Sequence, residues 1–216
     1  MAVLKKKLQT VTLGCSKNKV DTEHILSQVE DQYEIIPEGE DIPVDVLLLN
    51  TCGFIGDAKE ESIQAILEAV DRKSRGEVGK VVVFGCLSQR YASQMPELIP
   101  EVDAWYGARE FDPVIRELGC MPDSSKTSSR YLTTPSHYAY LKISEGCDRR
   151  CSYCAIPFIR GAHKSVPMEV LVEEAEKLAD KGVRELIIIA QDTTYYGLDL
   201  YRHRALAELL QKLSEV

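Results

Sequence analysis

The sequence has little of several features that define common protein classes. It contains one tryptophan and four phenylalanines in 216 residues, and it has no apolar run long enough to cross a bilayer. Acidic residues outnumber basic ones, giving a formal net charge of −8, which argues against direct nucleic-acid binding through a broad basic surface. No apolar leader follows Met1, so we expect no signal peptide, no membrane contact and a cytoplasmic location.

Seven cysteines are present, but the chain is not a small, disulfide-stapled protein. Unpaired cysteines in a cytosolic chain more often indicate metal binding or catalysis. Cys147, Cys151 and Cys154 follow the pattern C-x3-C-x2-C, with Tyr153 just before the last cysteine. Three thiolates at this spacing can hold three corners of a four-iron cluster, and the fourth iron is then open to a substrate or cofactor.

A zinc site is the alternative interpretation of these cysteines. Structural zinc needs four ligands, and His163 could supply the fourth. Zinc sites commonly pair cysteines as two C-x2-C units, however, and a second unit is absent. The spacing therefore favours an iron–sulfur cluster.

The first half of the chain has the alternating pattern of an α/β domain. Apolar runs predict strands, amphipathic stretches predict helices, and the runs are apolar on both faces, which is typical of an open parallel sheet with helices on both faces. The predicted strands cover residues 8–13, 44–49, 80–84 and 102–106. One predicted helix begins at residue 21, a second covers 58–70, and a third covers 88–98 with a break near Pro96.

A second group of cysteines follows three of these strands. Cys15, Cys52 and Cys86 each stand just past the carboxyl end of a predicted strand, the edge at which open α/β sheets bind ligands. A single cysteine there could be a small core residue. Three in successive βα units predict a second metal site, again with three thiolates.

The chain is predicted to have two domains, residues 1–119 and 137–216, joined by a polar linker over 120–136. Cys120 matches neither group and is interpreted as an incidental thiol. The second domain has a strand over 138–143, a helix from Pro167 to Gly182, a strand over 185–190 and a helix over 204–213. This β-α-β-α order predicts the first two units of a TIM-type partial barrel.

Taken together, these motifs resemble the methylthiotransferase branch of the radical S-adenosylmethionine (radical-SAM) superfamily. The resemblance covers essentially the whole chain. Lys17-Asn18, the Cys-Gly-Phe-Ile run from Cys52 and the run Ala190–Thr194 favour the RimO-type branch over the transfer-RNA branch. The motifs that carry the resemblance are residues 13–23, 50–55, 85–91 and the cysteine pattern from Cys147.

The resemblance implies two [4Fe–4S] clusters and SAM as cofactors. Cys15, Cys52 and Cys86 would hold an auxiliary cluster, and Cys147, Cys151 and Cys154 would hold the cluster that binds SAM. Tyr153 would flank the adenine of SAM. Gln191, Asp192 and Thr193 stand at the carboxyl end of a barrel strand, where catalytic and binding residues of such barrels gather, and are predicted cofactor-binding residues.

The implied substrate is an aspartate of a small-subunit ribosomal protein, protein twelve, whose β-carbon would receive a methylthio group. An electron donor would be needed, and the sulfur source stays open. Two alternatives are a transfer-RNA adenosine methylthiotransferase and a non-catalytic iron–sulfur fragment.

Two departures from the family pattern stand out. Val166 occupies the position before Pro167 at which family members carry an arginine. Only two βα units follow residue 137, whereas a complete eight-unit barrel needs about 250 residues. We therefore expect a truncated chain that is inactive alone, with a first domain that folds by itself and a second that does not.

Overall fold

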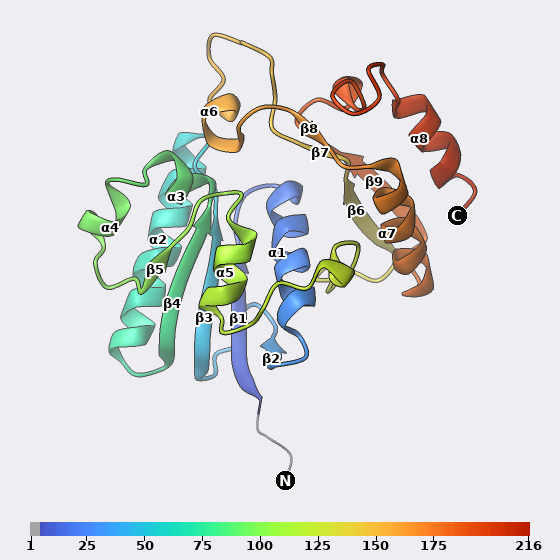
Figure 1. Cartoon of the computed structure of the whole chain (residues 1–216). Helices are drawn as coiled ribbons and strands as arrows, with labels where there is room; N and C mark the ends of the chain where they lie inside the picture. Colours follow the sequence, from blue (N-terminus) through green and yellow to red (C-terminus); the bar gives the residue numbers. More distant parts are fainter. Residues whose placement is uncertain (1–4) are drawn as a thin grey trace. The chain divides into compact units, whose positions relative to one another are not determined.

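The structure is a computed structural model that describes residues 5–216, and it divides into two compact units (Figure 1). The units are Met1–Pro122 and Asp123–Val216. Their boundary lies inside the predicted linker, residues 120–136. Within residues 5–216, no helix is long and apolar enough to cross a membrane.

The first unit is built on one parallel sheet of five strands in the order β2-β1-β3-β4-β5. From β1 the chain first adds β2 on one side and then adds β3, β4 and β5 on the other, so the strand order reverses between β1 and β3. Open sheets of this flavodoxin-like order bind ligands at that switch point. The predicted α/β class is therefore confirmed. The strands are β1 (Lys6–Thr12), β2 (Tyr33–Ile36), β3 (Val44–Thr51), β4 (Val78–Gly85) and β5 (Ala104–Trp105).

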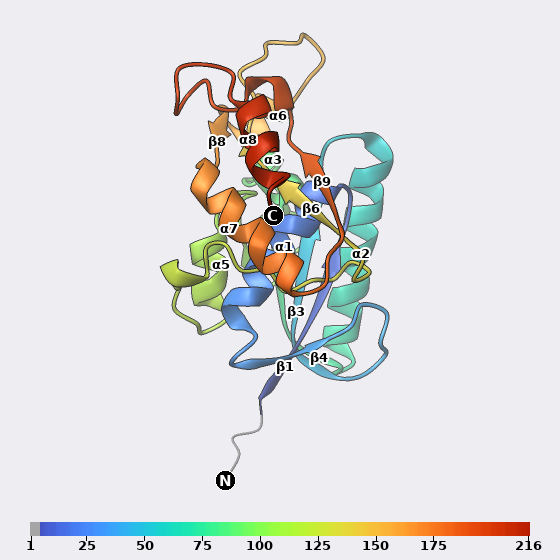
Figure 2. The same cartoon turned by 90° about the vertical axis from the view of Figure 1, so that its right-hand side faces the viewer.

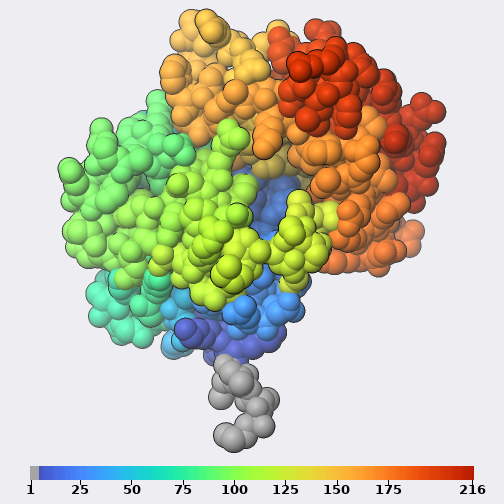
Figure 3. Space-filling view, in the orientation of Figure 1, coloured from blue at the N-terminus to red at the C-terminus, as the bar shows by residue number. Residues whose placement is uncertain are grey.

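Helices cover both faces of this sheet, as Figure 2 shows, with α1 (Ser16–Val29) and α5 (Phe111–Glu117) on one face and α2 (Gly56–Ser74) on the other. In the space-filling view, the green segments from α3 to α5 form much of the face of this unit that is turned to the viewer (Figure 3). The core under α2 contains buried side chains from alternate positions of β3 (Leu47 and Leu49) and β4 (Val81 and Val83), packed with Ile66 and Ala69 of α2 itself.

Several elements of the first unit differ from the predictions. The short edge strand β2 and helix α5 were not predicted. The helix predicted over residues 88–98 is broken, as expected, into two short helices, α3 (Cys86–Arg90) and α4 (Met95–Leu98), but residues 91–94 separate them. The break does not lie at Pro96, which stands in the first turn of α4, where a missing N–H costs no hydrogen bond.

The second unit has the predicted β-α-β-α order. Strand β6 (Tyr138–Lys142) pairs in parallel with β9 (Glu185–Ile189), and the helices are α7 (Met168–Asp180) and α8 (Leu206–Leu213). Leu209 of α8 is fully buried, whereas Leu210 is 45% exposed. Shorter elements are β7 (Ser144–Glu145), α6 (Ile156–Arg160), β8 (Lys164–Ser165) and the 3-10 turns η1 (Ser124–Lys126) and η2 (Thr193–Tyr195).

Part of the predicted linker is packed into the second unit. Ser128 and Arg130 are both buried, and Leu132 packs against Leu178 of α7 and Ala139 of β6. Residues 128–132 are therefore not a free tether, because they cover one end of the β6–β9 pair.

Candidate metal centres

The three cysteines of the first unit lie at the carboxyl edge of adjacent strands. Cys15 immediately precedes α1, Cys52 follows β3, and Cys86 opens α3 directly after β4. Thr51 and Gly85 are partners in the β3–β4 register, so Cys52 and Cys86 follow paired positions. The parallel order of β1, β3 and β4 thus brings together side chains that are far apart in the sequence.

Close backbone packing holds these cysteines. Gly14 has a φ of +88°, and a Cβ there would lie 2.6 Å from the Cβ and 2.8 Å from the Sγ of Cys52. A Cβ at Gly53 would lie 2.7 Å from the Cα of Leu87, next to Cys86. The glycines therefore let the three cysteine-bearing loops approach more closely than any larger residue would allow.

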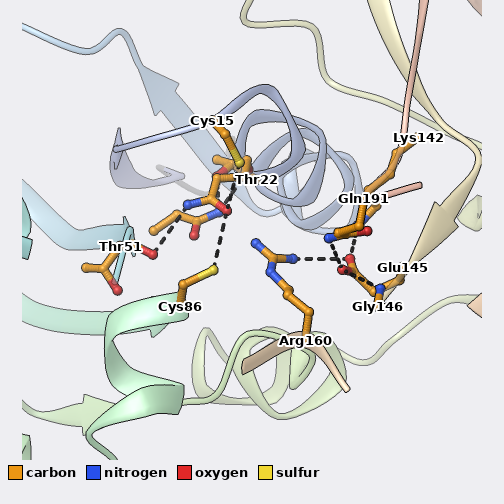
Figure 4. A network of polar contacts seen from close by, with 11 residues as sticks. Cys15, Thr22, Thr51, Cys86, Lys142, Glu145, Gly146, Arg160 and Gln191 are labelled. Atoms are coloured by element: carbon orange, nitrogen blue, oxygen red, sulfur yellow. Dashed lines mark hydrogen bonds and ion pairs between the residues drawn. The ribbon is translucent and has the colours of Figure 1, made fainter. Parts of the chain in front are cut away.

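Two buried asparagines, Asn18 and Asn50, cross-link the same edge, and Figure 4 labels Cys15, Thr22, Thr51 and Cys86 around them. The amide nitrogen of Asn50 donates to the carbonyl oxygen of Asn18 at 2.8 Å and to the hydroxyl of Thr22 at 3.1 Å. The Oδ1 of Asn18 lies 3.9 Å from the Sγ of Cys15 and 4.0 Å from that of Cys86. Sequence reasoning did not identify these asparagines as part of the site.

The cysteines of the second unit line a pocket of about 660 Å³. Its walls include Cys147, Cys151 and Cys154 together with Asp148, Arg149, Pro157 and Phe158. Cys151 is exposed, Cys147 and Cys154 are half-buried, and the loop carrying them turns so that the amide of Cys154 donates to the carbonyl of Cys151 at 3.1 Å. The pocket has the three thiols on its surface and room beside them for a ligand.

The base of this loop is closed by a tight backbone contact. Gly146 has a φ of +71°, and a Cβ there would lie 2.1 Å from the carbonyl oxygen of Ala162. The amide of Cys147 donates to the carbonyl of Gly161 at 3.0 Å, and the Asp148 carboxylate accepts from the amide of His163 at 3.0 Å. The start and the end of the cysteine loop are therefore fixed to each other.

Glu145 is the charged centre of this base (Figure 4). Its Oε2 lies 2.7 Å from Lys142 Nζ and 3.1 Å from Arg160 Nη1, and its Oε1 accepts from Gln191 Nε2 at 2.9 Å. Burial by itself raises the pKa of Glu145, but the cations Lys142 and Arg160 outweigh that effect and lower the pKa to about 2. Glu145 is therefore ionised at neutral pH, and two cations share its single negative charge.

A second contact ties the cysteine loop to the turn after β9. Arg149 Nε lies 2.9 Å from Asp192 Oδ2, and the Arg149 guanidinium stands 4.3 Å above the centre of the Tyr195 ring. The amide of Arg149 donates to Cys147 Sγ at 3.4 Å. The pKa of Asp192 is lowered, first by the Thr194 hydroxyl and then by Arg149.

The predicted cofactor-binding residues have different surroundings. Asp192 is turned toward the cysteine loop through Arg149, and Gln191 is bonded to Glu145 two positions before Cys147. Thr193 is half-buried at the start of η2, and Tyr153 is 88% exposed on the cysteine loop. Their predicted role toward SAM stays a prediction. Cys120 is buried in the first unit, with Sγ 3.9 Å from the carbonyl of Leu118.

The zinc interpretation is not favoured by the arrangement of side chains. In the part of the chain that the structure describes, no group of three or more His, Cys, Asp or Glu is placed to hold a single metal ion. His163, the possible fourth ligand, has Nε2 3.0 Å from Ser165 Oγ and packs edge-on against Tyr195. A single ion requires all its ligands in one coordination sphere, whereas a four-iron cluster takes each thiolate on a different iron and so accepts a wider spacing.

Comparison with known proteins agrees with this two-part arrangement. Residues 7–107 match the family described as UPF0004, and residues 141–215 match the radical SAM superfamily. Two relatives are named ribosomal protein uS12 methylthiotransferase RimO. The one from Cytophaga hutchinsonii is 50% identical to this chain over 98% of its length, and the one from Christiangramia forsetii is 51% identical over 98%. The chain is therefore similar, over nearly its whole length, to radical-SAM methylthiotransferases of the RimO type, and its second unit matches the radical SAM superfamily.

The chain spans about half the length of the curated relatives it matches, 49% and 47% for these two. Solved structures share the fold across both units. The cobalamin-dependent radical enzyme OxsB matches 98% of the chain with a TM-score of 0.60 and 14% identity. The methyltransferase TsrM from Kitasatospora setae matches 97% with a TM-score of 0.62 and 12% identity, and these two likenesses concern the fold alone.

Proposed function

We propose that the protein to which these two units belong is a radical-SAM methylthiotransferase, a transferase that adds a methylthio group to the β-carbon of an aspartate in ribosomal protein uS12. Two observations together carry the proposal. Each unit holds its own cysteine triad, and the chain is similar to RimO relatives across 97–98% of its length. The names of those relatives favour the ribosomal-protein substrate over transfer RNA.

The donor chemistry of both sites fits iron–sulfur clusters. Cys15, Cys52 and Cys86 offer three soft thiol ligands in a cradle that glycines keep open, and Cys147, Cys151 and Cys154 offer three more around a pocket with room for a ligand. When bound, a [4Fe–4S] cluster with an open iron and SAM would supply the radical chemistry. The electron donor and the sulfur source would come from outside these residues.

The chain's own residues would position these groups. Glu145, with Lys142 and Arg160, fixes the start of the cysteine loop, and Arg149 with Asp192 holds its middle. Asp192 would then act on the cluster loop through Arg149, in addition to its predicted role toward SAM.

Iron analysis tests the cluster assignment. Anaerobic reconstitution of the chain should give about eight irons per chain, the content of two four-iron clusters. Cys151→Ala and Cys52→Ala should each remove about half of the iron, and Cys120→Ala should remove none. Loss of all iron from one replacement would show that the triads share a site, and two zinc ions per chain in metal analysis would refute the clusters.

Product analysis tests the activity. A full-length relative that contains both units should convert SAM to 5′-deoxyadenosine under reduction and add a methylthio group to a uS12 peptide, but not to transfer RNA. Modification of transfer RNA instead would establish the alternative substrate. An absence of 5′-deoxyadenosine from the reconstituted full-length protein would leave only an iron–sulfur carrier.

A further inference from the structure

Asn18 contacts all three cysteine-bearing loops of the first unit. It stands in the first turn of α1, and none of its surface is exposed. Its Nδ2 donates to the carbonyl oxygen of Leu13 at 2.8 Å, two positions before Cys15, and to that of Thr51 at 3.3 Å, one position before Cys52. Its Oδ1 faces Cys15 Sγ at 3.9 Å and Cys86 Sγ at 4.0 Å.

These contacts also fix which end of the amide faces the sulfur atoms. Main-chain carbonyls accept hydrogen bonds and cannot donate them, so the NH2 group of Asn18 must point toward Leu13 and Thr51. The oxygen is left on the side of Cys15 and Cys86. The backbone of Asn18 is held in turn by Asn50, whose own side chain is 1% exposed.

We propose that Asn18 is the positioning residue of the auxiliary cluster site, and that its amide oxygen keeps the reduction potential of that cluster low. This inference rests on the proposed cluster at Cys15, Cys52 and Cys86. The two carbonyl bonds hold the loops in place before iron arrives. The oxygen then places a partial negative charge beside ligand sulfurs, and such a charge opposes the addition of an electron.

The two contacts of Asn18 change character when iron binds. A thiol of Cys15 or Cys86 can donate a weak hydrogen bond to Oδ1, but a thiolate bound to iron has no proton to donate. The oxygen therefore faces electron-rich sulfur in the loaded site. A purely structural asparagine would stabilise the fold equally in both states, so the potential of the cluster separates the two roles.

Two replacements of Asn18 should shift the potential in opposite directions. Asn18→Leu removes the oxygen, and the midpoint potential of the auxiliary cluster should become more positive. Asn18→Asp keeps the shape but adds negative charge, and the potential should become more negative. Both remove the bonds to the carbonyls of Leu13 and Thr51, so both should weaken iron retention, by about 10–100-fold in affinity for a residue that orients metal ligands.

Gln9 provides a matched control in the same sheet. It is another buried amide, 2% exposed, whose Nε2 donates to the carbonyls of Pro37 and Glu40 at 3.0 and 2.8 Å. Its Oε1 accepts from Arg72 Nη1 at 3.0 Å rather than facing a cysteine sulfur. Gln9→Leu should therefore destabilise the unit comparably without moving the potential. All variants are made in the full chain carrying Cys151→Ala, which removes the cluster of the second unit. The measured potential then belongs to the auxiliary cluster alone.

The experiment is redox titration followed by electron paramagnetic resonance, with iron release to a chelator measured in parallel. Opposite shifts for Asn18→Leu and Asn18→Asp, with no shift for Gln9→Leu, support the proposal. Equal potentials in all four proteins, or shifts of the same sign in both Asn18 variants, overturn it. If Cys52→Ala leaves the iron content unchanged, the auxiliary cluster itself is absent and the proposed function fails with it. Asn18→Asp retains the side-chain volume, so it provides the measurement if Asn18→Leu does not fold.

Discussion

Arg130 and Glu174 form a buried ion pair, with 2.7 Å between Nη1 and Oε1 and side-chain exposures of 1% and 5%. The same Arg130 nitrogen donates to the carbonyl oxygen of Tyr140 in β6 at 3.0 Å. Arg130 thereby joins the segment before β6 to both β6 and α7. A residue from the predicted linker is thus part of the core of the second unit.

Replacement of one partner of this pair should destabilise the second unit. Arg130→Ala leaves the Glu174 carboxylate buried without its counter-charge, and such changes cost about 3–5 kcal/mol of unfolding free energy. The double variant Arg130→Met with Glu174→Leu should recover much of that loss, because both charges are removed together. Denaturant unfolding followed by circular dichroism measures both. A loss of unfolding free energy below about 1 kcal/mol, which is typical of an exposed ion pair, would contradict the prediction.

Limited proteolysis should detect the boundary between the units at a specific bond. Lys126 lies in the partly accessible turn η1, whereas Arg130 is buried, so trypsin should cut after Lys126 and spare Arg130. Mass spectrometry of the fragments identifies the bond. The segment 128–132 should stay with the second unit, and early cleavage after Arg130 would show that this segment is not packed as described.

Glu145 should make the second unit sensitive to acid. Its pKa is lowered in the folded state to about 2, from an ordinary value of 4.5, so its stabilising effect is complete above pH 4.5 and is lost as the pH falls toward 2. The shift corresponds to about 3 kcal/mol. Glu145→Gln should lower stability at pH 7 and remove this part of the acid dependence, as measured by denaturant unfolding at several pH values.

Glu173 is the control for this prediction. It pairs with Lys177 one helical turn away on the exposed face of α7, so Glu173→Gln should change stability little at any pH. An acid profile of Glu145→Gln that matches the unaltered chain would mean that Glu145 does not carry the effect.

Gly14 and Gly39 offer a direct test of the packing around Cys52. Both have a φ of +88°, but a Cβ at Gly14 would meet Cys52 whereas nothing lies within 4 Å at Gly39. Gly39→Ala should cost only the backbone strain, about 1–2 kcal/mol. Gly14→Ala should cost more, by about 1–3 kcal/mol from overpacking, and should also reduce the iron bound after reconstitution. Equal stability losses with equal iron would contradict the close contact.

Strands and helices with strong apolar patterns could be predicted from the sequence. Elements that are short, or that depend on contacts between residues far apart in the sequence, could not. The runs that became β1, β3, β4, β6 and β9 are apolar over most of their length, and the carboxyl ends of β1, β3 and β4 led to the prediction that Cys15, Cys52 and Cys86 lie together. Strand β2 has four residues at the sheet edge, too few for periodicity to distinguish from a loop. Tyr33, at its start, is fixed instead by donating its hydroxyl to the carbonyl of Leu118, a contact 85 residues away.

The polar residues that support the sites could not be predicted for the same reason. Glu145 meets Arg160 and Gln191, which are 15 and 46 residues away, and no local spacing indicates such a group. Asn18 offered a weak signal, since it stands three residues after Cys15 in the first turn of the same helix. Its contact with Cys86, 68 residues later, becomes visible only when the strands are placed side by side.

The two cysteine groups differ in how much of the chain must be in place before each is complete. Cys147, Cys151 and Cys154 are joined by a short loop, so these thiols are close together even in a newly synthesised, unfolded chain. Cys15, Cys52 and Cys86 meet only after β1, β3 and β4 have paired. If the proposed clusters form, metal capture at the first unit would be a late event that requires completed folding, whereas the second unit could capture iron early and fold around it. A shortage of iron during synthesis should therefore affect the two centres at different stages of maturation.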